Sequence, residues 1–72
     1  MNAFYLVLNK KENDKYVAFM VKCCESNNLL SVLMQYSGLS SVNICKTHKQ
    51  AQGLVDFWNE GYKENGTYLI EE

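Results

Sequence analysis

The strongest pattern in the sequence is the stretch THKQAQGLVDFWNEGY, residues 47–62. Its apolar residues recur at the three- and four-residue spacing of a single helix face. These residues are Ala51, Leu54, Val55, Trp58 and Tyr62. Thr47 and Gln50 fit a capping box, in which the threonine side chain caps the first turn and the glutamine side chain reaches back. The stretch therefore predicts an amphipathic helix that ends at Asn65-Gly66, residues that tolerate the left-handed conformation.

Four other stretches are typical of β-strands: residues 3–8, 16–24, 42–45 and 67–70. Alternation along the first strand places Phe4, Leu6 and Leu8 on one face and Tyr5 and Val7 on the other. The same alternation in the second strand separates Val17, Phe19, Val21 and Cys23 from Tyr16, Ala18, Met20 and Lys22. The polar residues 9–15 between these strands predict a seven-residue hairpin loop.

A shorter helix is expected between the second and third strands. The residues Ser26-Asn27-Asn28 offer N-cap side chains, and Ser37-Gly38 ends the helix. Its apolar stripe is predicted to be Leu29, Leu30, Leu33 and Met34. In the longer helix, Gly53 costs roughly 1 kcal/mol relative to alanine, so we expect close packing at that position.

The predicted element order is β-β-α-β-α-β over a single domain, residues 1–72, because a chain of this length has room for one core. A strand-helix-strand crossover returns parallel and right-handed in nearly all proteins. We therefore expect an α+β two-layer sandwich: a mixed four-stranded sheet with both helices on one face. This arrangement leaves the other face of the sheet open.

Composition disfavours nucleic acid as a partner. Lys and Arg together number 7, all of them lysine, against 8 acidic residues, giving a formal net charge of -1. The chain has no arginine, the residue that most often contacts guanine edges and phosphates, and it lacks the excess of basic residues expected of a nucleic-acid-binding protein. The alternative hypothesis of weak nucleic-acid binding depends on Lys10, Lys11 and Lys15 in the predicted hairpin loop.

The sequence predicts a cytoplasmic protein. It begins with Met1, and we expect it to be a complete gene product. No apolar run approaches the ~20 residues that span a bilayer, and the N-terminus has no basic region and no small-residue cleavage site. Three cysteines, an odd number, favour a reducing compartment over a closed disulfide framework.

Reactive or metal-binding groups form no convincing set, and the sequence predicts no enzyme and no cofactor. Cys45 and His48 meet at a strand-to-helix junction, where a helix N-terminus can stabilise a thiolate. A zinc site could draw on the same two residues with Cys23 and Cys24, but adjacent strand residues point to opposite faces. Three carboxylates recur every four residues, a spacing typical of the solvated face of a helix: Asp56, Glu60 and Glu64.

The predicted open sheet face is instead unusually apolar for a solvated surface. We expect an interaction surface there, supplemented by a border residue of the longer helix. Its residues are Tyr5, Val7, Ala18, Met20, Phe57 and Tyr68. A contiguous apolar patch favours a non-enzymatic interaction protein that binds a protein partner or forms a homodimer.

The C-terminal half also resembles a known group of proteins. The matching residues are Cys45-Lys46-Thr47, Ala51, Phe57-Trp58-Asn59, Tyr62-Lys63 and Asn65-Gly66-Thr67-Tyr68. They resemble small proteins encoded on conjugative transposons and related mobile elements of clostridia and other Firmicutes. The resemblance implies an accessory, regulatory protein in a Gram-positive cytoplasm, with no catalytic residues to carry over.

Overall fold

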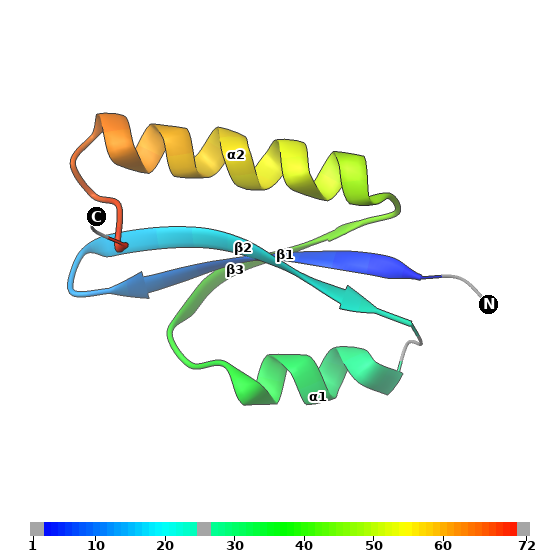
Figure 1. The fold of residues 1–72 in the computed structure, drawn as a ribbon. Helices are drawn as coiled ribbons and strands as arrows, with labels where there is room; N and C mark the ends of the chain where they lie inside the picture. Colours follow the sequence, from blue (N-terminus) through cyan, green and yellow to red (C-terminus); the bar gives the residue numbers. More distant parts are fainter. Residues whose placement is uncertain (1–2, 25–26, 71–72) are drawn as a thin grey trace.

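The computed structural model describes residues 3–24 and 27–70 (Figure 1). Within these residues the elements are β1 (Phe4–Glu12), β2 (Lys15–Cys23), α1 (Asn27–Gln35), β3 (Leu39–Cys45) and α2 (His48–Glu64). The strands form a 3-stranded sheet in the order β2-β1-β3, with both pairs antiparallel. Figure 1 shows α2 above this sheet and α1 below it. The α+β class is as predicted, but the layers are helix, sheet and helix.

A two-residue turn joins β1 to β2. Asn13 and Asp14 both have positive φ angles, 52° and 66°, which is the signature of the type I′ turn that matches strand twist. The predicted seven-residue loop was wrong because both strands continue into it, as far as the pair Glu12 and Lys15. Polar residues can occupy these strand ends because their side chains remain partly or fully exposed there.

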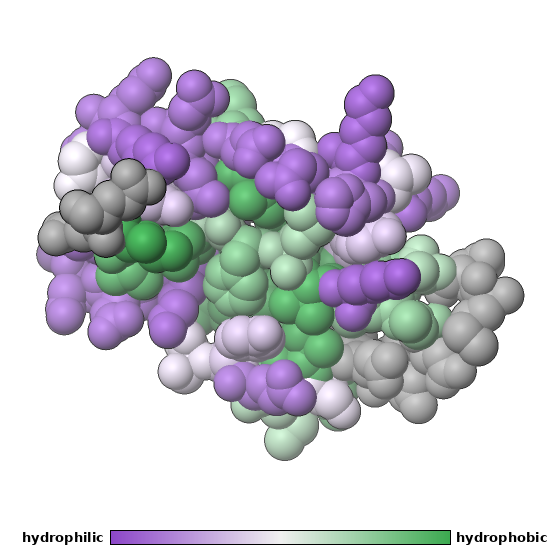
Figure 2. All heavy atoms as spheres, in the orientation of Figure 1, coloured by the Kyte–Doolittle hydropathy of each residue, from purple (hydrophilic) through white to green (hydrophobic). Residues whose placement is uncertain are grey.

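The predicted alternation of strand faces is confirmed by the register. Leu6 lies opposite Val21 and Leu8 opposite Phe19, and this face carries the α1-side core, formed by Leu6, Leu8 and Cys23. The other face carries the α2-side core, formed by Val7, Ala18, Ala51 and Val55. In Figure 2, hydrophilic residues cover the outer side of α2, and hydrophobic residues gather in the band beneath it.

The predicted four-stranded sheet with both helices on one face was wrong. Both β2 and β3 are antiparallel to β1, so they run parallel to each other with β1 between them. α1 connects β2 to β3 across the sheet, and α2 then leads back from β3 towards β2 (Figure 1). Two crossovers of the same hand that travel in opposite directions place their helices on opposite faces.

The predicted fourth strand, residues 67–70, is reduced to one parallel bridge between Tyr16 and Tyr68. The backbone amide of Tyr16 donates to the Thr67 carbonyl at 2.7 Å, and the Leu69 amide donates to the Tyr16 carbonyl at 2.7 Å. This segment therefore touches the outer edge of β2 at a single point. It does not add a full strand to the sheet.

The apolar side of α1 differs from the predicted stripe. Val32, Leu33 and Tyr36 pack on the α1-side core, whereas Leu30 is 67% exposed and Met34 is 78% exposed. Tyr36 contacts the ring of Phe19 on β2, with ring centroids 5.2 Å apart. Ser26 of the predicted cap and the Leu29 side chain lie outside what the structure describes.

The predicted α2 pattern is confirmed, since Ala51 and Val55 are buried and Leu54, Trp58 and Tyr62 pack beside them. Thr47 Oγ1 accepts a hydrogen bond from the Gln50 amide at 3.1 Å. Gln50 Oε1 reaches back to the amide of Lys46 at 3.3 Å, one residue before the threonine. The expected close packing at Gly53 was wrong, because a Cβ there would meet nothing within 4 Å.

Alanine substitutions at two glycines should have opposite effects on stability. Gly38→Ala should destabilise the fold by about 1–2 kcal/mol, because Gly38 has a φ of +74° and a Cβ there would lie 3.0 Å from the Lys11 carbonyl oxygen. Gly53→Ala should stabilise it by roughly 1 kcal/mol through helix propensity. Urea unfolding of both variants beside the wild type measures the two changes, and equal signs would contradict the assignment.

Candidate functional site

The apolar sheet face that the sequence predicted to be open is covered by α2. Val7 and Ala18 are buried in the α2-side core, and Tyr5 and Met20 pack against it. These residues therefore hold α2 on the sheet: Val7 and Ala18 are buried, and Tyr5 and Met20 remain only partly exposed. The interaction surface predicted from them was misplaced, because a helix of the chain itself occupies that face.

The two remaining residues of the predicted surface lie apart from that face. Phe57, at the border of the apolar stripe, is 71% exposed on α2 and projects outward instead of covering the core. Tyr68 is half-buried at the bridge to Tyr16, and Lys63 Nζ lies 4.9 Å from the centre of its ring. Only Phe57 is available to a partner as a large exposed side chain.

The lysines proposed for nucleic-acid contact do not form one patch. Lys10 and Lys15 lie on the α1 side of the sheet, since Lys10 follows Leu8 in alternation and Lys15 pairs with Glu12, whereas Lys11 lies on the α2 side. Lys11 Nζ lies 3.8 Å from the Asp14 carboxylate and 5.8 Å from the centre of the Tyr16 ring. These positions give no row of free ammonium groups that could follow a phosphate backbone.

The cysteines and His48 do not assemble a reactive centre in the part of the chain that the structure describes. Cys45 packs against the α2-side core, and the His48 ring stands edge-on to Tyr5 at 5.6 Å. Burial, and next the neighbouring Cys24, raise the pKa of the Cys23 thiol. Across residues 3–24 and 27–70, no group of three or more His, Cys, Asp or Glu could hold a metal ion.

The outer edge of β2 is covered at Tyr16 and Ala18 by groups of the chain itself. The Asn59 side chain on α2 mimics a neighbouring strand: its Oδ1 accepts from the Ala18 amide at 2.8 Å, and its Nδ2 donates to the Ala18 carbonyl at 3.0 Å. Two residues earlier, the Tyr16 amide and carbonyl are bonded to the segment 67–69. Such coverage prevents an edge strand from pairing with another chain.

The outer edge of β3 has no such cover among the described residues. Its sequence, LSSVNIC, contains no charge and no proline, the two side-chain devices that most often protect an edge. Residues 40–44 are all exposed, and a register shift leaves Ser40 out of the strand pairing, although its hydroxyl donates to the Asn9 carbonyl at 3.2 Å. The remaining stretch, residues 41–45, is a regular open edge.

Two exposed apolar side chains lie beside this edge. Val42 and Ile44 are 38% and 63% exposed, and they pair with Leu8 and Leu6 on the α1-side face. α1 packs over β2 and does not reach β3. The β3 edge and these two side chains together form the candidate interface, which we name the β3 edge site.

A buried polar network connects α2 to the base of this site. The Tyr62 hydroxyl donates to Asn9 Oδ1 at 2.5 Å, and Asn9 Nδ2 donates to Ser41 Oγ at 3.0 Å. Asn9 is 2% exposed, so all of these bonds replace bonds to water. Burial raises the pKa of Tyr62, with the stacked Tyr16 ring adding a smaller effect. The network fixes the position of β3 relative to β1.

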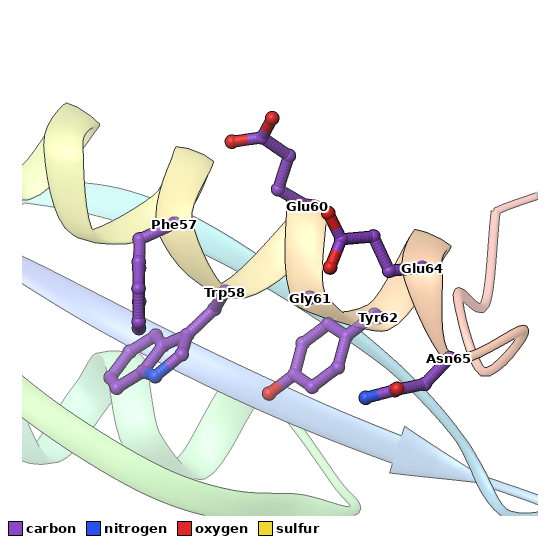
Figure 3. A pocket seen from close by; sticks show the side chains of 7 residues that line it. All are labelled: Phe57, Trp58, Glu60, Gly61, Tyr62, Glu64 and Asn65. Carbon is purple, nitrogen blue, oxygen red and sulfur yellow. The ribbon is translucent and has the colours of Figure 1, made fainter.

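A second feature is a shallow hollow of about 400 Å³ on one flank of α2, shown in Figure 3. We name it the α2 hollow. It is lined by Phe57, Trp58, Glu60, Gly61, Tyr62, Glu64 and Asn65. At about 100° per residue, Phe57 and Gly61 lie on the flank opposite Asn59, and Asn59 contacts β2. The hollow therefore lies on the side of α2 that faces β3.

Comparisons with protein-family models, curated proteins and solved structures gave no match. No α-helix among residues 3–24 and 27–70 has both the length and the apolar character needed to cross a membrane. Sequence reasoning missed the β3 edge site, although the uncharged run 39–45 was a signal for it.

Removal of the Asn59 amide should open the second edge of the sheet. Asn59→Ala leaves the Ala18 amide and carbonyl without their partners, which should cost about 1–3 kcal/mol of stability. The variant should also assemble beyond the wild-type state, because the β2 edge at Ala18 is then free to pair. Urea unfolding and light scattering measure the two effects. Gln52→Ala, an exposed change on the same helix, is the control, and an unchanged assembly state for Asn59→Ala would contradict the capping role.

Stability should decline at alkaline pH through Tyr62. Its pKa is raised in the folded chain, so the folded state favours the neutral phenol. The resulting stability is fully present below the ordinary tyrosine pKa near 10 and is lost as the pH rises through the raised value. Urea unfolding of the wild type and Tyr62→Phe between pH 8 and about pH 11 tests this, and a Tyr62→Phe variant with the same pH profile would contradict it.

Proposed function

We propose that this protein is a small non-enzymatic interaction module that works as a two-fold dimer through the β3 edge site. The observation that carries the proposal is the contrast between the two sheet edges. Asn59 and the segment 67–69 cover the edge of β2 at Ala18 and Tyr16, whereas the uncharged β3 is exposed and uncovered among the described residues. Open strands of this kind pair with an added strand through main-chain hydrogen bonds.

A second copy of the chain suits this edge better than a charged partner does. Two β3 strands can pair antiparallel about a two-fold axis, which gives each copy the same contacts. Because β3 carries no charge, this pairing brings no like charges together. The cover over Tyr16 and Ala18 on the β2 edge then hinders the addition of a further copy there, whereas a second fully open edge would permit a filament.

The apolar side chains select a register for this pairing. An axis at Asn43 places Val42 of each copy opposite Ile44 of the other, and both residues are exposed in the single chain. The two apolar cross-strand pairs are each worth roughly 0.2–1 kcal/mol relative to alanine pairs. A domain of this size buries a modest share of its surface, so association also supports its fold.

The proposed setting is the cytoplasm, in an accessory or regulatory role on a mobile genetic element. The resemblance of the stretch 45–68 supports this setting. The odd number of cysteines and their free state in the structure are consistent with a reducing compartment. The proposal requires no cofactor and no catalytic group.

Charge at the β3 edge should separate the copies. The wild type should have about twice the 8.3 kDa mass of one chain in light scattering, and Ile44→Lys should have the mass of one chain. The new lysines would lie together at the two-fold seam, where like charges oppose pairing. Met34→Lys is the matched control, because Met34 is an equally exposed apolar residue away from the edge.

Two outcomes of this experiment would overturn the proposal. A wild-type chain that stays monomeric over the whole concentration series would overturn the proposal. So would an Ile44→Lys variant that remains a dimer while a Met34→Lys variant dissociates, because the interface would then involve α1. Urea unfolding of Ile44→Lys checks that the variant is still folded, so that loss of the dimer reflects a change in association and not unfolding.

A further inference from the structure

We propose that the α2 hollow binds a lysine side chain of a partner polypeptide. The hollow has aromatic walls and a carboxylate rim. In Figure 3, Phe57 and Trp58 project together from α2, Tyr62 lies further along, and the carboxylates of Glu60 and Glu64 lie above. A lysine has an apolar four-carbon stem that suits the walls and an ammonium group that suits the rim.

The aromatic walls are partly open to solvent. Phe57 is 71% exposed, and Trp58 and Tyr62 are half-buried and pack on the α2-side core, with the Tyr62 ring also stacked on Tyr16 at 5.2 Å between ring centroids. Rings held in this way present fixed surfaces to a ligand at little entropic cost. Their π-faces also attract a cation within about 6 Å.

Among residues 3–24 and 27–70, neither Glu60 nor Glu64 forms an ion pair. Among the described residues the recorded ion pair joins Lys11 to Asp14, and the ammonium of Lys63 lies over the Tyr68 ring. Glu60 and Glu64 are both exposed and stand four residues apart, a spacing at which like charges repel on a helix. Glu64 is also the last residue of α2, where the helix dipole disfavours an anion. A bound ammonium would relieve both effects.

Gly61 lines the hollow, and the absence of a side chain at this position leaves the space open. It stands between Phe57 and Glu64 on the same flank, and a Cβ built on it would meet nothing within 4 Å. Glycine in a helix costs roughly 1 kcal/mol relative to alanine, and no contact inside the chain explains it here. A larger side chain at this position would fill the space without touching the core.

Two small probes separate a lysine site from a merely apolar one. Acetyl-lysine methylamide carries the ammonium, and acetyl-norleucine methylamide has a similar stem without it. Trp58 is the only tryptophan in the chain, so its fluorescence reports occupancy, and amide chemical shifts of residues 57–65 locate the probe. The lysine probe should bind roughly threefold or more tightly than norleucine at low salt, and added salt should reduce this ratio.

Matched variants test each part of the site. Gly61→Leu should abolish the response to the lysine probe, whereas Gln52→Leu, an exposed change on the flank of the same helix that carries Asn59, should leave it unchanged. The double variant Glu60→Gln, Glu64→Gln should reduce the lysine response to the norleucine level. Asp56→Asn, which removes a carboxylate on the other flank, should have no effect.

Equal binding of the two probes, no response to either, or a lysine response that survives Gly61→Leu would overturn the inference. An acetyl-arginine methylamide that binds more tightly than the lysine probe would also overturn the assignment to lysine. None of the substituted residues lies on β3. The hollow can therefore fail while the dimer stands, and the dimer can fail while the hollow binds.

Discussion

The structure depends on the burial of β1 from both sides. Four consecutive residues, Leu6-Val7-Leu8-Asn9, are buried in the centre of this strand. Because successive side chains point to opposite faces, a buried run of this length requires a cover on each face. α1 and α2 supply these covers, and the two outer strands are positioned by their pairing with β1. The layers, the two cores and the accessibility of the sheet edges all follow from this strand.

The two edges of the sheet differ because the two helices lie over β2 more than over β3. α2 comes close enough to β2 for the Asn59 amide to replace a neighbouring strand, and the chain then returns to the same edge near Tyr16. On the other side, β3 is held to β1 by its ladder and by the bond from Asn9 to Ser41. The chain thus covers part of the β2 edge, whereas the described residues leave the outer edge of β3 exposed.

The local elements were predictable because period and capping depend on neighbouring residues. The faces of β1 and β2, the apolar side of α2 and the Thr47 cap follow from spacing alone. The arrangement of layers does not follow from spacing, because an apolar sheet face has the same sequence pattern whether a helix of the chain or a partner covers it. The continuous apolar run 4–8 was the available signal for burial on both faces. The β3 edge site and the α2 hollow depend on where long-range contacts end, which no local pattern encodes.

The Asn13-Asp14 turn has a consequence for the order of folding. It joins β1 to β2 with the shortest connection in the sheet, so this hairpin closes at low entropic cost. Pairing of β3 with β1 joins residues more than thirty positions apart, as in Asn9 and Ser41, and such contacts form more slowly. We infer that the hairpin is the nucleus and that β3 docks late. β3, the strand with the open edge, is then also the last strand to pair with the sheet.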